Sequence, residues 1–207
     1  MRRIETETCV AEGAEFLRQL EPRFAMALDQ TGPLPLRLRD DGFAQLLSAI
    51  VSQQVSVASA NAIWGRLCSA GYQRPEAVSV ARDPQLRECG LSRQKIRYAR
   101  ALAAANLDYE FLRTAPTDEV VATLVTVPGI GRWTAEIYAM FSLGHADVFA
   151  PGDLALQEAT RALFELEARP TEKKMRQMAE AWSPWQSVAA RLLWSYYRFI
   201  KEREGIR

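Results

Sequence analysis

The sequence has few of the residues from which metal centres and disulfides are built. It contains one histidine, His145, and three cysteines, Cys9, Cys68 and Cys89, which lie far apart and form no CxxC pair. This set does not complete a Cys/His zinc site, and an odd number of cysteines does not pair into a disulfide framework. We therefore expect reduced thiols and a protein of the cytoplasm.

Long apolar runs and a strong charge of one sign are also missing. No run of 18 apolar residues is present, and the first residues, MRRIETETCVAEG, have no apolar stretch after the arginines. The sequence therefore predicts neither a membrane span nor a secretory signal. The 26 basic and 25 acidic residues nearly cancel, leaving a net charge of +1. A nucleic-acid-binding protein of this charge must gather its basic residues on one face and hold phosphates with backbone amides.

Apolar residues at helical spacing are abundant instead. Hydrophobic residues make up 48% of the 207 positions, enough for a packed core. In segment 43–50 they recur at i, i+3, i+4 and i+7, and no segment has the alternation typical of a β-strand. We predict an all-α protein of about ten helices, with N-caps at Ser56, Ser92 and Thr117 and a last long helix opened by Ser183-Pro184. The helix that starts at Arg132 is expected to bury Trp133, Ile137, Met140 and Phe141.

Two of the predicted helices are joined by a glycine turn, V-P-G-I-G, at Val127–Gly131. Gly129 and Gly131 can adopt positive φ and have no Cβ, so a ligand can approach the backbone closely. The N–H groups at the start of the following helix favour an anion such as a phosphate. Such a turn alone would often serve only to reverse the chain, but the flanking sequence LVTVPGIGRWTAE favours phosphate binding. We expect a bulky residue at either glycine to weaken that binding without unfolding the protein.

A second informative segment, F-A-P-G-D at Phe149–Asp153, ends in an acidic residue directly before a predicted helix. An aspartate after a Pro-Gly turn commonly caps a helix, and this is the simpler interpretation of Asp153. A role in chemistry is compatible with it, because a cap is held in one rotamer while its second oxygen can face a cleft. Asp153 is therefore a candidate for both roles.

Together, the hairpin and the Pro/Gly-rich loop with its aspartate resemble the helix-hairpin-helix (HhH-GPD) superfamily of base-excision DNA glycosylases. The resemblance runs from about Phe43 to Tyr197. It implies a single all-α unit over residues 1–207 with the helix-hairpin-helix glycosylase fold, in which two helical lobes flank an active-site cleft. One lobe would be a helical bundle of residues 42–146 that contains the hairpin, and the second would combine 1–41 with 147–207.

The resemblance implies hydrolysis of an N-glycosidic bond, with Asp153 as the catalytic carboxylate beside an oxocarbenium-like transition state. A base alkylated at a ring nitrogen already carries positive charge and leaves readily, so one carboxylate suffices. In relatives that also cleave the strand, a lysine nucleophile stands at the position of Trp133, so the resemblance implies a monofunctional enzyme. Among these relatives, the endonuclease III branch carries an iron–sulfur cluster on four C-terminal cysteines. No cysteine follows Cys89, and no cofactor is expected.

The segments IVSQQVSVASA, GIGRWTAEIYAMFSLG and SPWQSVAARLLW resemble the alkylbase branch, which includes 3-methyladenine DNA glycosylase II of bacteria. The implied substrate is double-stranded DNA that contains 3-methyladenine, 7-methylguanine or similar bases. Trp133 and Trp194 would line the base pocket, with ordinary core packing as the alternative, and Ile137 stands where a relative has an aromatic residue. Gln54 lies at the family's wedge position, with a solvated loop residue as the alternative. Gln53 would support the loop or reach the opposite strand.

Further contacts to DNA are implied for the hairpin and a neighbouring helix. They are Gly129, Ile130, Gly131, Arg132, Thr134 and Lys95, with an exposed helix face as the alternative for the basic side chains. In this family the main-chain carbonyls of Val125, Val127 and Ile130 would bind a monovalent cation, and a monomer is expected. Two other functions stay open, a glycosylase for oxidised or mismatched bases and a non-catalytic helix-hairpin-helix DNA-binding module.

Overall fold

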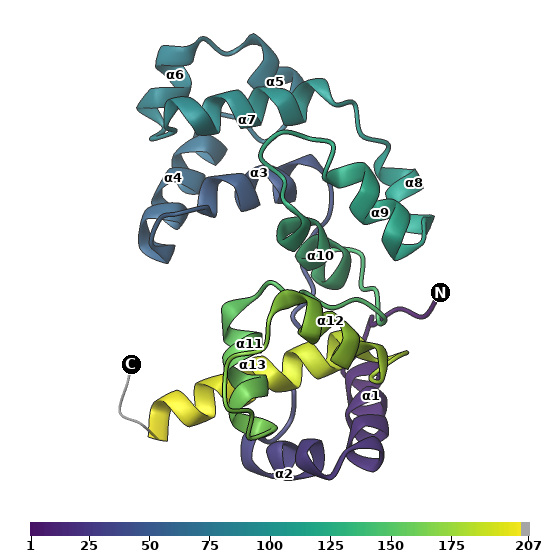
Figure 1. Ribbon diagram of the computed structural model, residues 1–207. Coiled ribbons are helices and arrows are strands. Elements are labelled where there is room, and N and C mark those ends of the chain that lie inside the picture. Colours follow the sequence, from purple (N-terminus) through teal and green to yellow (C-terminus); the bar gives the residue numbers. More distant parts are fainter. Residues whose placement is uncertain (204–207) are drawn as a thin grey trace. The chain divides into compact units, whose positions relative to one another are not determined.

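The computed structural model describes residues 1–203 and is built from helices (Figure 1). These residues form thirteen α-helices and no β-strand, which confirms the all-α prediction. More helices are present than expected because α5 (Pro75–Val80), α6 (Asp83–Glu88) and α8 (Tyr109–Thr114) have six residues each. Helices of under two turns are too short for an apolar period to reveal them.

The chain divides into two compact units. Unit 1 comprises Met1–Leu38 and Ala139–Arg207, and unit 2 comprises Arg39–Tyr138. Helix α10 (Arg132–Phe141) begins in unit 2 and ends in unit 1. Within residues 1–203, no helix combines the length and the hydropathy that crossing a membrane requires.

Unit 1 is organised around its longest helix. Helix α13 (Gln186–Arg203) packs against α1 (Glu7–Leu20), α2 (Pro22–Thr31) and α11 (Leu154–Leu163), as Figure 1 shows. Helix α12 (Glu172–Glu180) belongs to the same unit. The N-terminal half of α13 is buried almost all round, as expected for a helix at the centre of a core.

Arg191 of α13 is the largest fully buried side chain in the part of the chain described here, with 1% of its surface exposed. Its guanidinium donates to the carbonyl of Leu36 from Nε at 3.2 Å and from Nη2 at 3.0 Å, and to the carbonyl of Ser187 at 2.9 Å. The guanidinium carbon also lies 4.8 Å from the ring centre of Phe141. Burial lowers the pKa of Arg191 to about 10. This one side chain therefore attaches the segment after α2 to the core of unit 1.

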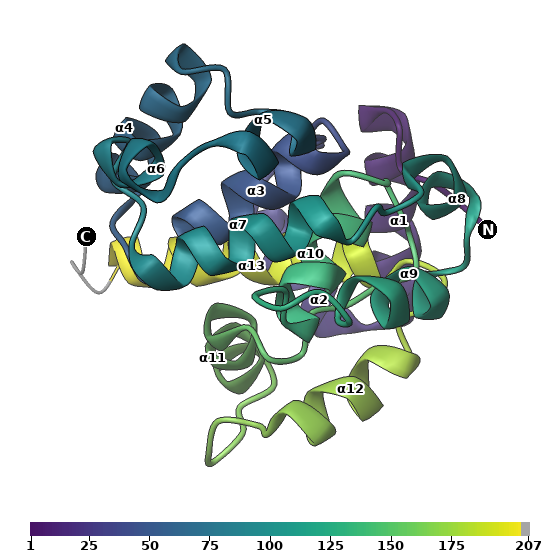
Figure 2. The ribbon, with the colours of Figure 1, turned by 90° about the horizontal axis from the view of Figure 1, so that it is seen from above.

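Unit 2 is organised around α7 (Arg93–Ala104). Helix α7 packs against α3 (Phe43–Ser52), α5 and α6, and α3 packs against α4 (Val57–Ser69). Figure 2 shows α4 and α6 towards one end of α7, with α8 and α9 (Thr117–Leu124) towards the other. Side chains from α3, α4, α6 and α7 form a common core that includes Val51, Ile63, Leu67, Leu86 and Ile96.

Of the predicted N-caps, two are confirmed and one is wrong. The hydroxyls of Ser56 and Ser92 accept backbone N–H groups at the starts of α4 and α7. Thr117 is instead the first residue of α9, and Pro116 is its N-cap. The reason is that the Pro116 carbonyl already accepts the first helical bond, from the N–H of Val120 at 3.0 Å.

The last helix begins later than the Ser183-Pro184 pair predicts. Helix α13 starts at Gln186. Trp182 and Trp185 are both buried, and the Trp185 N–H donates to the Trp182 carbonyl at 2.9 Å. Residues 181–184 form a turn, so the proline lies in that turn and not in the first turn of a helix.

Candidate functional site

The hairpin between α9 and α10 in unit 2 is built around Gly129. Its φ is +95°, in the left-handed region that favours glycine. A Cβ on Gly129 would lie 2.4 Å from Cγ of Tyr98, so the tyrosine ring occupies the space that a side chain would need. The turn is closed by the Ile130 N–H, which donates to the Val127 carbonyl at 3.0 Å. Glycine is therefore required here by both the backbone conformation and the packing.

Gly131 differs from Gly129 on both counts. Its φ is not positive, and no atom lies within 4 Å of a Cβ built on it. Its carbonyl accepts the N–H of Ala135 at 3.0 Å, which starts α10. The first N–H groups of an α-helix have no acceptor four residues earlier, and they make this end favourable for an anion. The expectation that either glycine tolerates a bulky residue is therefore wrong for Gly129, whereas Gly131 has the space.

The polar side chains at the start of α10 have different environments. Arg132 is exposed, and its Nε donates to Oε1 of Glu136 at 3.0 Å. Glu136 is buried, with 3% exposed, and sequence reasoning did not single it out, although the i, i+4 spacing of opposite charges was the available signal. Thr134 is 7% exposed, so the structure gives no support to a direct side-chain contact between Thr134 and DNA.

Trp133 and Ile137 form the least buried apolar stripe of α10. They are four residues apart and share one face of the helix. Trp133 is 46% exposed and Ile137 is half-buried, whereas the apolar residues buried within α10 are Ala135, Tyr138, Ala139, Met140 and Phe141. The predicted buried face is therefore wrong for Trp133, and core packing does not account for its position. Tyr138 points elsewhere, with its hydroxyl accepting the N–H of Gly42 at 2.8 Å.

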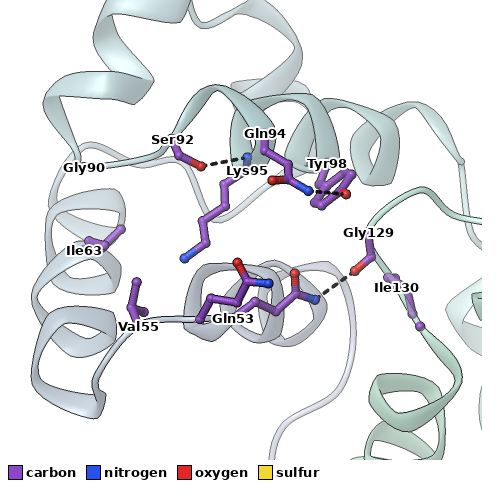
Figure 3. A pocket seen from close by; sticks show the side chains of 12 residues that line it. Gln53, Val55, Ile63, Gly90, Ser92, Gln94, Lys95, Tyr98, Gly129 and Ile130 are labelled. Carbon is purple, nitrogen blue, oxygen red and sulfur yellow. Dashed lines mark hydrogen bonds between the residues drawn. The ribbon is translucent and has the colours of Figure 1, made fainter.

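The turn between α3 and α4 carries Gln53 and Gln54, beside the hairpin of the same unit (Figure 3). Nε2 of Gln53 donates to the Gly129 carbonyl at 2.9 Å, so this side chain is directed at the hairpin. Gln54 is exposed and has a φ of +57°. Lys95 of α7 is half-buried, and its Nζ donates to the Val51 carbonyl at 2.6 Å. Burial lowers the pKa of Lys95 from its ordinary value.

These groups surround a cavity of about 580 Å³. Its walls include the turn 53–55, the start of α7 and the hairpin glycines. The cavity therefore lies between two segments that the sequence selects as candidates for DNA binding, both within unit 2.

Asp153 is the N-cap of α11 in unit 1, as predicted. Its Oδ1 accepts three N–H groups, from the backbone of Ala155 at 3.0 Å, the backbone of Leu156 at 3.1 Å and Nε1 of Trp194 at 3.2 Å. The half-buried indole of Trp194 also packs against Phe141, with ring centres 5.7 Å apart. The contact between Trp194 and Asp153 was not foreseen, because it depends on the packing of α11 against α13. It fixes the position of the carboxylate.

Within residues 1–203, no group of three or more His, Cys, Asp or Glu side chains is placed to hold a metal ion. The carbonyls named for a monovalent cation belong to the hairpin. One of them, that of Val127, already accepts the Ile130 N–H. The cation stays a prediction.

Comparison with known families extends this picture. The profile of the HhH-GPD superfamily of base excision DNA repair proteins matches residues 47–184, more than half of the chain. The chain belongs to this superfamily. The matched range includes the hairpin and Asp153 but ends before Trp194.

Among HhH-GPD proteins, the chain is similar to several named for 3-methyladenine. It is 30% identical to DNA-3-methyladenine glycosylase 1 of Schizosaccharomyces pombe over 178 residues, which span 82% of this chain and 78% of that protein. The solved structure of a DNA-3-methyladenine glycosidase from Bacillus halodurans superposes with a TM-score of 0.83 at 31% identity, covering 98% of this chain and 95% of that one. A 3-methyladenine DNA glycosylase of S. pombe in complex with abasic DNA superposes with a TM-score of 0.76 at 27% identity, covering 88% and 95%.

Proposed function

We propose that the protein is a monofunctional DNA glycosylase that hydrolyses the N-glycosidic bond of alkylated bases, with Asp153 as its catalytic carboxylate. One observation carries the proposal. Asp153, which the resemblance implies to be the carboxylate of the Pro/Gly-rich loop, is held at the N-terminus of α11 by three N–H donors on one oxygen. The similarity to proteins named DNA-3-methyladenine glycosylase supports an alkylated base as the substrate.

The chemistry follows from the charge of the substrate. When the bond from C1′ to the base nitrogen breaks, its electron pair leaves with the base, and a cationic N-alkylated base departs as a neutral molecule. The sugar develops oxocarbenium character, which a nearby carboxylate stabilises. Water then adds to C1′ and releases one proton, giving a free base and an abasic site. No second carboxylic acid and no cofactor are needed for this leaving group.

The hydrogen bonds of Asp153 suit it to this role. A charge that is already oriented stabilises a transition state without reorganising during the reaction. The two backbone N–H groups of α11 and the indole N–H of Trp194 hold the carboxylate in one orientation. Trp194 therefore supports the carboxylate in addition to the pocket-lining role that the resemblance implies.

DNA would be bound by backbone and side-chain groups of unit 2. The open backbone at Gly131 and the N-terminus of α10 favour a phosphate. The exposed face of Trp133, with Ile137 beside it, suits stacking on an electron-poor alkylated base. Gln54 is exposed and available as a wedge that fills the gap left by an extruded base. Because the side chain of Trp133 cannot form a Schiff base, strand cleavage is not expected. We also propose that the protein acts on duplex DNA as a monomer.

The decisive experiment is base release by an Asp153→Asn variant. Asparagine keeps the capping oxygen and removes the charge, so the fold is retained. We expect release of 3-methyladenine and 7-methylguanine from methylated DNA to fall about 100-fold or more. The matched control is Asp108→Asn, at the N-cap of α8, which should leave release unchanged. Release by both proteins at the rate of DNA alone would support the non-catalytic DNA-binding module instead, and equal release above that rate would reject Asp153 as the catalytic carboxylate.

A panel of duplexes with defined lesions tests the substrate class. We expect cleavage of 3-methyladenine to exceed that of 8-oxoguanine, because a base alkylated at a ring nitrogen is already cationic and leaves readily, whereas 8-oxoguanine is a neutral and poorer leaving group. A preference for 8-oxoguanine would contradict the alkylated-base proposal and support a glycosylase for oxidised bases.

A further inference from the structure

The reversal between α3 and α4 forces one glutamine into a strained conformation. Helix α3 ends at Ser52 and α4 begins at Val57, so four residues make the turn. Gln54 takes a φ of +57° within it. The left-handed region is unfavourable for a residue with a Cβ, so surrounding contacts must hold the conformation in place.

The first of these contacts comes before the turn. The last carbonyls of an α-helix have no intrahelical donor. In α3 the carbonyl of Val51 is instead bound by Nζ of Lys95, 44 residues later in the chain, at 2.6 Å. Figure 3 shows the Lys95 side chain extending from α7 towards the turn. The C-terminal end of α3 is thereby attached to α7.

The second contact lies within the turn. Gln53 precedes the strained residue directly, and its Nε2 donates to the Gly129 carbonyl at 2.9 Å. Gly129 is in turn fixed by the ring of Tyr98, which fills the place of its missing side chain. Lys95 and Tyr98 are three residues apart on α7 and share a face. One face of α7 therefore supports both the turn and the glycine hairpin.

We propose that Gln53 and Lys95 are positioning residues that hold Gln54 in its left-handed conformation and fix the turn against the glycine hairpin. The inference rests on the proposed function, since it concerns how a base is extruded. A hairpin that grips a phosphate and a wedge that enters the duplex must act on the same stretch of DNA. The two hydrogen bonds fix the turn, α7 and the hairpin relative to one another within unit 2. When the hairpin binds a phosphate, Gln54 is thereby placed to enter the duplex.

The first test measures wedge insertion without catalysis. The probe is a duplex containing an abasic-site analogue next to 2-aminopurine, whose fluorescence changes when a side chain fills the gap. We expect Gln53→Met and Lys95→Met to weaken binding to this duplex about three- to tenfold and to reduce the fluorescence change. Gln19→Met, an exposed glutamine on α1, is the matched control and should behave as wild type. Thermal unfolding of each variant confirms that it is folded.

A double-mutant cycle with Gln54→Ala separates positioning from a general structural effect. If Gln53 acts through Gln54, Gln53→Met has no further effect on insertion or on base release once Gln54 is alanine. If the fold-change of the double variant equals the product of the two single fold-changes, the proposal is overturned. A wild-type fluorescence change in Gln53→Met or in Lys95→Met would overturn it as well.

Salt dependence separates support of the turn from a direct phosphate contact at Lys95. Loss of a phosphate contact lowers the slope of log affinity against log salt by about 1. We expect Lys95→Met to leave the slope unchanged and Lys95→Arg, which keeps a donor for Val51, to restore insertion. A reduced slope for Lys95→Met would assign Lys95 to the DNA backbone and contradict its positioning role.

Failure of the proposed function is distinguishable from failure of this inference. Absence of base release by the wild type from every lesion would reject the glycosylase. The abasic-analogue duplex would still report whether Gln53 and Lys95 control insertion.

Discussion

Asp153 is both the N-cap of α11 and the acceptor of a long-range hydrogen bond from Trp194. As an N-cap it accepts the backbone N–H groups of Ala155 and Leu156, which any aspartate before a helix could do. The indole N–H of Trp194 reaches the same oxygen from 41 residues later. The cap orients one oxygen and the indole restricts it further. A carboxylate held in this way is prepared for a developing positive charge.

The two hairpin glycines should respond differently to substitution. Gly131→Val places a side chain in open space next to the first turn of α10, where a phosphate is proposed to bind. We expect weaker binding to undamaged duplex at matched salt, with the unfolding temperature close to that of wild type. Gly129→Val forces a side chain into the ring of Tyr98 at a positive φ. We expect this variant to lose stability as well as binding.

Fluorescence anisotropy with labelled duplex measures the DNA affinity of each variant, and thermal unfolding measures its unfolding temperature. Unchanged DNA affinity in a folded Gly131→Val protein would remove the hairpin from the DNA-binding surface. An unfolding temperature for Gly129→Val equal to that of wild type would show that the hairpin can move away from Tyr98.

Helix α10 illustrates why helix faces are hard to assign from an apolar pattern. Seven of the nine residues from Trp133 to Phe141 are apolar, so the pattern allows more than one buried face. The prediction placed Trp133 and Ile137 inside, whereas the structure exposes Trp133 and leaves Ile137 half-buried. Where most positions are apolar, the neighbouring helices decide which face of the helix is covered.

Helix α13 depends on one buried charge. Arg191→Met keeps the length of the side chain but leaves the carbonyls of Leu36 and Ser187 without this donor. We expect a loss of roughly 2–4 kcal/mol in the free energy of unfolding, because buried polar groups without partners are costly. Denaturant unfolding measures it. Arg198→Met, an exposed arginine on the same helix, is the control and should change the free energy little.

For the molecule as a whole, His145 predicts a pH dependence of stability. It is the only histidine, it is fully buried, and burial together with the charges of Arg3 and the Met1 amino group lowers its pKa from 6.5 to about 4. Between these pH values the unfolded chain binds a proton that the folded protein does not. The contribution of His145 to stability is therefore fully present above pH 6.5 and is lost as the pH drops towards 4, by at most about 1.4 kcal/mol per pH unit.

Denaturant unfolding between pH 7 and pH 5 checks this prediction. In that window few carboxyl groups titrate, so the slope reports mainly on histidine. His145→Asn removes the titrating ring and should flatten the curve, whatever its effect on absolute stability. A slope that persists in His145→Asn would assign the pH dependence to other groups.

Many features of the candidate site could be predicted from the sequence. The glycine turn, the Pro/Gly loop and the serine caps are short-range signals, because neighbouring residues alone decide the conformation they favour. Membership of the HhH-GPD superfamily and the resemblance to alkylbase glycosylases rest on such motifs and on their order along the chain. Gln53 and Lys95 were identified as candidates, but the sequence left their targets open.

The targets were decided by the tertiary structure. The Gln53 amide reaches Gly129, Lys95 reaches Val51 and Trp194 reaches Asp153, across separations of 76, 44 and 41 residues. An amide, an ammonium or an indole N–H binds any acceptor that packing brings within about 3 Å, and no local pattern encodes that choice. The sequence by itself identified the candidates for binding a phosphate and for stabilising a positive charge on the sugar. Only the packing of α7 on the hairpin and of α13 on α11 decided which groups Gln53, Lys95 and Trp194 bind. Those contacts depend on how whole helices bury their apolar faces.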